Sequence, residues 1–189
     1  MTSLTNRRIV LASRPHGEPG TDNFRIEDAP VPPTGHNQIL VRNRFLSLDP
    51  YMRGRMDEGP SYAAPVAIDA VMEGGTVGEV LESNHPDYHP GELLVLGGGW
   101  QTHTVLEPTA PLRKLPKDDA LPLSTALGVY GMPGFTAYAG LHEIGKPQAG
   151  ETLVVAAASW ATVAPTGPLA AATTRVSPAC GLPISCRPA

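Results

Sequence analysis

Residues 150–160 read Gly150-Glu151-Thr152-Leu153-Val154-Val155-Ala156-Ala157-Ala158-Ser159-Trp160. An apolar strand that opens into a glycine-rich turn and a helix is how α/β proteins bind dinucleotide phosphates. Here Trp160 stands where the turn should begin, and the next glycine is Gly167. From Trp160 to Ala189 there is no Asp, Glu or Lys. We therefore expect the strand of a nucleotide site without its phosphate loop, and a change in the character of the chain at residue 160.

The part of the chain before this run is rich in turn residues. Glycine and proline account for 20 and 21 of the 189 residues, above the usual share of about an eighth. Because helix interiors tolerate neither residue, strands and turns are expected. Alternating or apolar runs bounded by turn residues predict strands at Arg7–Leu11, Phe24–Asp28, Gln38–Leu48, Val71–Leu81, Glu92–Leu96 and Trp100–Val105. Glycines inside Val71–Leu81 predict a bulge or a tight bend.

The period changes after residue 119. Helical spacing predicts short helices over 121–129 and 135–143, followed by a strand over 152–158. In the tail, Pro168 in a first turn predicts a short helix over 166–175. These patterns predict a strand-rich domain over 1–119, the start of a second domain over 120–159 and a disordered tail over 160–189.

Charge and composition exclude several classes of partner. The formal net charge is −4, whereas nucleic-acid-binding domains usually present a basic face. No apolar run reaches signal-peptide or membrane-span length, so we expect a cytoplasmic protein. Both cysteines, Cys180 and Cys186, lie in the tail and are expected to be free thiols. A thiolate zinc site is therefore excluded before residue 160, and no metal is expected.

Three segments resemble a known family. They are Phe45–Met56 with its Asp-Pro-Tyr-Met-Arg motif, Glu73–Val80, and Leu127–Tyr138 with its Gly-Met-Pro-Gly-Phe-Thr-Ala-Tyr motif. In order and spacing they resemble the medium-chain dehydrogenase/reductase superfamily, in its zinc-free branch of NADP-dependent alkenal and prostaglandin (leukotriene B4 dehydrogenase-like) reductases. The resemblance covers about residues 7–159. It implies a mainly β fold, a GroES-like barrel followed by the first helix and strand of a truncated Rossmann α/β domain.

The resemblance also implies a reaction and a substrate side. Members reduce the C=C bond of small α,β-unsaturated aldehydes or ketones with NADPH, and negative charge develops on the substrate carbonyl oxygen. A hydrogen-bond donor aimed at that oxygen stabilises the charge. The resemblance places Tyr51 beside the substrate as the catalytic candidate; packing of a barrel loop is the alternative. Arg53 is a second substrate-binding candidate, for which the alternative is a loop contact to Asp49 or Asp57.

The cofactor side is assigned to the second specific motif. By resemblance, Met132, Pro133 and Thr136 contact the nicotinamide of NADP, and an apolar methionine there would exclude water from the hydride path. Packing at a helix end is the alternative for these three residues.

We expect the chain to be an amino-terminal fragment of such a reductase, inactive by itself, whose longer relatives form homodimers. The abrupt change to a tail without Asp or Glu, rich in Ala, Pro and Thr, suggests the hypothesis of translation out of frame. A protein of another class, a stand-alone GroES-like barrel that serves as a binding module, is the competing hypothesis. An aromatic-lined peptide groove would favour the module, and a cleft edge lined by Tyr51, Met132 and Thr136 would favour the enzyme fragment.

Overall fold

The computed structural model describes residues 4–59, 63–117, 121–148, 152–156 and 171–175. The chain divides into two compact units, Met1–Gly134 and Phe135–Ala189. Strands dominate the first unit, while the second contains most of one helix and a two-stranded sheet. Within the described ranges, no helix has both the length and the apolar character that a membrane crossing requires.

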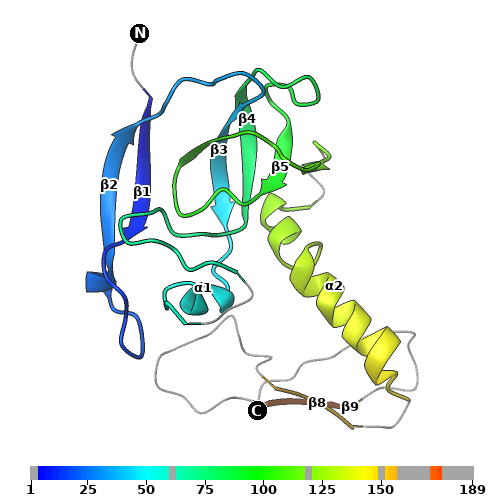
Figure 1. The fold of residues 1–189 in the computed structure, drawn as a ribbon. Helices are drawn as coiled ribbons and strands as arrows, with labels where there is room; N and C mark the ends of the chain where they lie inside the picture. The colour runs from blue at the N-terminus through cyan, green and yellow to red at the C-terminus, as the bar shows by residue number, and fades with distance from the viewer. Residues whose placement is uncertain (1–3, 60–62, 118–120, 149–151, 157–170, 176–189) are drawn as a thin grey trace. The chain divides into compact units, whose positions relative to one another are not determined.

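The described strands of the first unit form two antiparallel sheets (Figure 1). The smaller sheet pairs β1 (Thr5–Leu11) with β2 (Phe24–Pro30). The larger sheet has the order β6-β3-β4-β5-β7. Its strands are β3 (Ile39–Leu46), β4 (Thr76–Ser83), β5 (Leu93–Leu96), β6 (His103–Leu106) and β7 (Arg113–Leu115). The mainly β fold class predicted from the sequence is confirmed.

Strand β1 joins the two sheets through its second edge. Ile9 donates its N–H to the carbonyl of Trp100 at 2.8 Å and accepts from the N–H of Met72 at 3.0 Å. Thr102 donates its N–H to the carbonyl of Arg7 at 2.9 Å. Because the segment around residue 101 continues into β6, these bonds extend the hydrogen-bonded surface from the larger sheet to β1.

Two apolar clusters lie against these strands. One contains the buried side chains of Ile39, Val41, Val80, Tyr88, Leu94 and Leu96. The other contains Leu11, Met52, Met56, Val66 and Met72. Burying a side chain of this size stabilises the fold by about 1.5 to 3 kcal/mol. The second cluster is the one that supports the candidate site, because Met52 and Met56 belong to the loop that carries Tyr51.

The register between β3 and β4 shifts twice. On β4, Leu81 has no partner, because Leu40 pairs with Glu82 and Val41 with Val80, so the bulge predicted inside 71–81 lies at Leu81 rather than at a glycine. The second shift leaves an extra residue on β3. Asn43 pairs with Gly78 and Phe45 with Val77, so Arg44 has no partner in the register. A β-carbon at Gly78 would approach the carbonyl oxygen of Arg42 to 2.9 Å. Glycine is therefore required where the two backbones come together.

The helical predictions are confirmed in position and refined in type. The region 121–129 forms a 3₁₀ helix, η2 (Leu123–Leu127), and α2 (Met132–Ala139) continues into a π-helical turn, η3 (Gly140–Gly145). A short helix, α1 (Tyr51–Gly54), and the 3₁₀ turn η1 (Thr21–Asn23) were not predicted.

One prediction for the tail is wrong. Strand β8 (Thr152–Ala156) pairs antiparallel with β9 (Ala171–Arg175), where the sequence predicted the end of a helix. A helix of about ten residues is marginal by itself, whereas pairing with β8 satisfies backbone groups of β9. The predicted absence of a phosphate loop falls on residues 157–170, outside the described residues, and the domain boundaries at 119 and 159 stay predictions.

Candidate substrate and cofactor site

The loop that carries the predicted substrate residues folds around Asp49. The hydroxyl of Ser47 donates to Asp49 Oδ1 at 3.0 Å, and the N–H of Met52 donates to the carbonyl of Asp49 at 3.1 Å. Pro50 precedes α1 with a helical backbone, φ −58° and ψ −37°. Proline suits this position because a helix needs no donor there. The Asp-Pro pair therefore starts α1 and fixes where Tyr51 begins.

Tyr51 occupies the first position of α1 and is half-buried. It packs against the second apolar cluster, the one that contains Met52, Met56 and Met72. Its neighbour Met52 is buried in that cluster, with 3 % of its surface exposed. Trp100 packs against the same cluster and stacks on Phe24 with ring centroids 5.4 Å apart. This packing gives Tyr51 a defined position at the edge of an apolar core.

Arg53 is engaged with the protein itself. Its Nε and Nη2 donate to the carbonyl of Gly17 at 2.9 and 2.8 Å, and its Nη1 lies 2.8 Å from Asp57 Oδ1. The guanidinium therefore ties α1 to the loop around residue 17, and Asp57 is one of the two acids that the sequence suggested. A substrate contact by Arg53 stays a prediction.

A polar network that sequence reasoning missed anchors the turn at Gly98. Asn43 donates through Nδ2 to the carbonyl of Gln101 and to Thr104 Oγ1, both at 2.9 Å. The hydroxyl of Thr76 donates to Asn43 Oδ1 at 3.1 Å. Gly98 donates its N–H to Thr76 Oγ1 at 3.2 Å and accepts from Thr104 Oγ1 at 2.8 Å. The sequence did contain a signal for this network, because Asn43 and Thr76 are polar residues within strands that are otherwise largely apolar.

This network positions Trp100 relative to the loop of Tyr51. A β-carbon at Gly98 would lie 2.5 Å from Asn43 Oδ1, so the turn closes only with glycine. A β-carbon at Gly74 would meet Met52 Cε at 3.1 Å and Trp100 Cδ1 at 3.2 Å. The glycines of this region therefore permit the close packing of Trp100 and Met52.

The predicted cofactor residues share the first turns of α2. Met132, Pro133 and Thr136 are all exposed, with 68 % of the surface of Met132 open to solvent. Met132 and Thr136 are four residues apart and therefore lie on one side of the helix. Packing of a helix end does not bury these side chains among the described residues.

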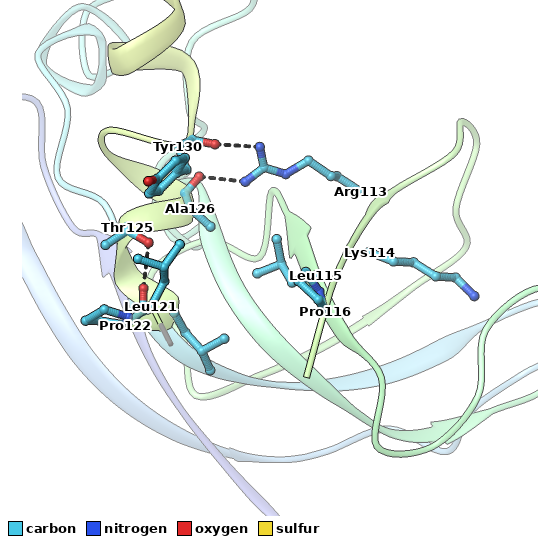
Figure 2. A pocket seen from close by; sticks show the side chains of 10 residues that line it. Arg113, Lys114, Leu115, Pro116, Leu121, Pro122, Thr125, Ala126 and Tyr130 are labelled. Carbon is cyan, nitrogen blue, oxygen red and sulfur yellow. Dashed lines mark hydrogen bonds between the residues drawn. The ribbon is translucent and has the colours of Figure 1, made fainter. Parts of the chain in front are cut away.

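Figure 2 shows a pocket of about 370 Å³ elsewhere in the first unit, between β7 and η2. Arg113 lies across it and donates to the carbonyls of Tyr130 and Ala126 at 2.7 and 3.0 Å. The remaining lining side chains are mainly leucines and prolines, and Tyr130 is the one aromatic residue among them. The pocket contains none of the five predicted site residues, and it is not the aromatic-lined groove expected of a binding module.

One histidine of the larger sheet has a shifted pKa. The pKa of His103 is lowered from its ordinary value near 6.5, chiefly by burial and also by the positive charge of Arg42, against a backbone hydrogen bond with Thr5. His103 lies on β6, apart from α1 in the sequence. Within the described ranges, no three His, Cys, Asp or Glu side chains gather as metal ligands.

Comparisons with known proteins show that this chain is similar to reductases. Residues 7–114 match the family described as the N-terminal domain of oxidoreductase. The NADPH-dependent curcumin reductase of Escherichia coli is 56 % identical over 154 residues, which are 82 % of this chain and 44 % of that protein. The NADP⁺-dependent 2-alkenal reductase of Nicotiana tabacum is 39 % identical over 163 residues, 84 % of this chain and 47 % of the relative.

Solved structures agree with these relatives. CurA from Vibrio vulnificus in complex with NADPH is 48 % identical and superposes with a TM-score of 0.69, over 77 % of this chain and 42 % of that one. This chain thus spans about half the length of the relatives that it matches. On the family match over residues 7–114, the chain belongs to the medium-chain dehydrogenase/reductase superfamily, of which it contains the N-terminal oxidoreductase domain.

Proposed function

We propose that these residues belong to a reductase that uses NADPH to reduce the C=C bond of an α,β-unsaturated aldehyde or ketone. The observation that supports this most strongly is the 56 % identity with the E. coli NADPH-dependent curcumin reductase. The tobacco relative, named as a 2-alkenal reductase, points to the same class of conjugated carbonyl. The substrates we propose are therefore small enones and alkenals.

Tyr51 stabilises the reacting carbonyl in this proposal. When bound, NADPH would supply the hydride that is added to the β-carbon of the substrate, and water would supply the proton that the α-carbon takes up to complete the reduction. As the double bond shifts, negative charge grows on the carbonyl oxygen, and a phenol hydroxyl that donates to this oxygen lowers the barrier. Tyr51 is suited to the role because the buried Met52 fixes the helix on which it stands. Arg53 supports the same loop through Gly17 and contributes positive charge near it.

The described residues fit the nicotinamide end of the cofactor. Exposed Met132 and Pro133 offer an apolar surface, and Thr136 adds one hydroxyl, which suits a flat ring with a polar amide. Helix α2 contains no Lys or Arg that could pair with phosphates. Contacts to the phosphates would have to come from residues outside α2. We propose that Met132 keeps water from the hydride path, and that the chain by itself is not catalytically competent.

A chimera tests the proposed reaction whether or not the chain by itself is catalytically competent. Residues 1–156 joined to the remaining half of the E. coli curcumin reductase should oxidise NADPH in the presence of a medium-chain 2-alkenal, and a metal chelator should not reduce the rate. A folded chimera that binds NADPH and consumes no alkenal would contradict the proposal.

Tyr51→Phe in the chimera tests the residue assignment. Loss of the main donor to an oxyanion costs about 3 to 4 kcal/mol, but a cofactor hydroxyl can share this role, so we expect kcat/KM to fall about tenfold. Tyr88→Phe is the matched control, because Tyr88 uses its hydroxyl to accept the N–H of Leu112 at 2.9 Å. It should cost stability and leave kcat/KM unchanged. Equal kinetics in Tyr51→Phe and the parent would move the substrate site away from α1.

A further inference from the structure

Strand β2 has one free edge in the described part of the chain. It pairs only with β1, which lies between it and the rest of the first unit, and Figure 1 draws it at the outer margin of that unit. Ala12 donates its N–H to the carbonyl of Asn23, and Val31 donates to the carbonyl of Leu4. In an antiparallel ladder the bonded residues alternate. Arg25, Glu27 and Ala29 therefore bond toward β1, and Phe24, Ile26 and Asp28 direct their backbone groups outward.

The sequence of this edge is complementary to itself. An antiparallel copy of β2 centred on Ile26 sets Ile26 against Ile26, and Arg25 against Glu27 on both sides of the centre. Residues directly opposite one another project from the same face, where opposite charges attract and like charges repel. Ile26 is 67 % exposed despite its apolar side chain. The pairing would cover this side chain with its own symmetry mate.

The two ends of β2 limit which of its backbone N–H groups can pair with a second copy. The N–H of Phe24 is bonded to the carbonyl of Thr21, and Pro30 has no N–H. The donors left on the edge are those of Ile26 and Asp28. In the centred register, Ile26 bonds Ile26 of the other copy and Asp28 donates to the carbonyl of Phe24. A register shifted by two residues separates Arg25 from Glu27 and loses the charge pairing.

We propose that the free edge of β2 pairs with β2 of a second copy of this chain, in an antiparallel two-fold arrangement centred on Ile26. The resulting dimer is weak, because the shared strand is short and exposed ion pairs contribute little. Within one chain Arg25 already forms ion pairs with Glu27 and with Asp69, both at 2.7 Å, and Glu27 also pairs with Arg8 at 2.8 Å. The second copy therefore adds opposite charges to an existing network.

Sedimentation equilibrium of the full chain, at protein concentrations up to millimolar, tests the proposal. Ile26→Pro removes the central outward donor without removing a bond to β1, and edge strands accept proline at such a position. Ile26→Val is the matched control that keeps the N–H. We expect a concentration-dependent dimer for the parent and for Ile26→Val, and at least tenfold weaker association for Ile26→Pro. A monomeric parent, or equal association in Ile26→Pro, would overturn the proposal.

A pair of charge variants tests the register and does not depend on the folding of Ile26→Pro. Arg25→Glu sets Glu against Glu27, and Glu27→Arg sets Arg against Arg25, so each variant by itself should associate about tenfold more weakly than the parent. Mixed together, the two restore opposite charges at both positions. Recovery of the dimer in the mixture supports the centred register. Association of either variant at parental strength, or no recovery on mixing, excludes it.

Discussion

Replacing Asn43 with Asp perturbs the polar network with almost no change in shape. The amide nitrogen that donates to the carbonyl of Gln101 and to Thr104 Oγ1, both at 2.9 Å, becomes an oxygen that can only accept. Thr104 can turn its hydroxyl toward the new carboxylate only by leaving the carbonyl of Gly98, 2.8 Å away. In either arrangement the carbonyl of Gln101 loses the donor that Asn43 supplied, whereas the carbonyl of Gly98 still accepts from Gln101 Nε2 at 2.8 Å.

The expected cost is about 3 kcal/mol, because an unsatisfied buried acceptor costs about 1 to 3 kcal/mol and a partly buried charge adds to it. For a domain of this size that corresponds to a fall in Tm of about 10 °C. The environment raises the pKa of the new carboxyl above its unfolded value near 3.9. The loss is therefore complete above the folded pKa and shrinks as the pH falls toward the unfolded value.

Thermal unfolding followed by circular dichroism, between about pH 3.5 and pH 8, measures both effects. Asn84→Asp is the matched control, since Asn84 also donates through Nδ2 to two carbonyls, of Thr34 at 2.8 Å and of Gly35 at 3.1 Å, but at an exposed site. Water replaces those bonds, and we expect a change within about 0.5 kcal/mol. If Asn43→Asp lowers Tm no more than Asn84→Asp does, the hydrogen bonds of Asn43 do not stabilise the turn at Gly98.

Three further predictions follow from the same structure. The chain by itself should bind NADPH no better than millimolar, worth about 4 kcal/mol; saturation of cofactor fluorescence at low micromolar concentration would contradict this. The pKa of His103 is lowered in the folded protein, so the stability that its neutral form provides is complete above the unfolded pKa and is lost as the pH falls toward the folded pKa. His103→Gln should therefore flatten the dependence of Tm on pH below neutrality, and an unchanged slope would refute this. Gly74→Ala sets a β-carbon 2.6 Å from Leu46 Cδ1 and should cost about 1 to 3 kcal/mol in urea unfolding, whereas Gly59→Ala, in open space, should not.

Local patterns predicted most strands of the first unit, because alternation reflects one buried face. The predicted Arg7–Leu11 and Glu92–Leu96 lie within one or two residues of β1 and β5. Strand β7 was missed because its three residues, Arg113–Leu115, show no alternation; it forms because β5 offers a free edge. The tail shows the reverse error, since a helical pattern became β9 when β8 supplied a partner.

The candidate site divides in a similar way. Its residues could be named from two motifs in the sequence, whereas the helix α1 that carries Tyr51 and Arg53 was not predicted. That Arg53 is engaged with Gly17, and that Asn43 and Thr76 anchor a glycine turn beside Trp100, could not be predicted, because these partners are 33 to 58 residues apart. The sequence by itself thus determined the strand-rich class, the family and the chemistry of the motifs. The tertiary structure decided the strand order, the bulge at Arg44 and the free edge of β2, since all three depend on which backbones meet across long separations.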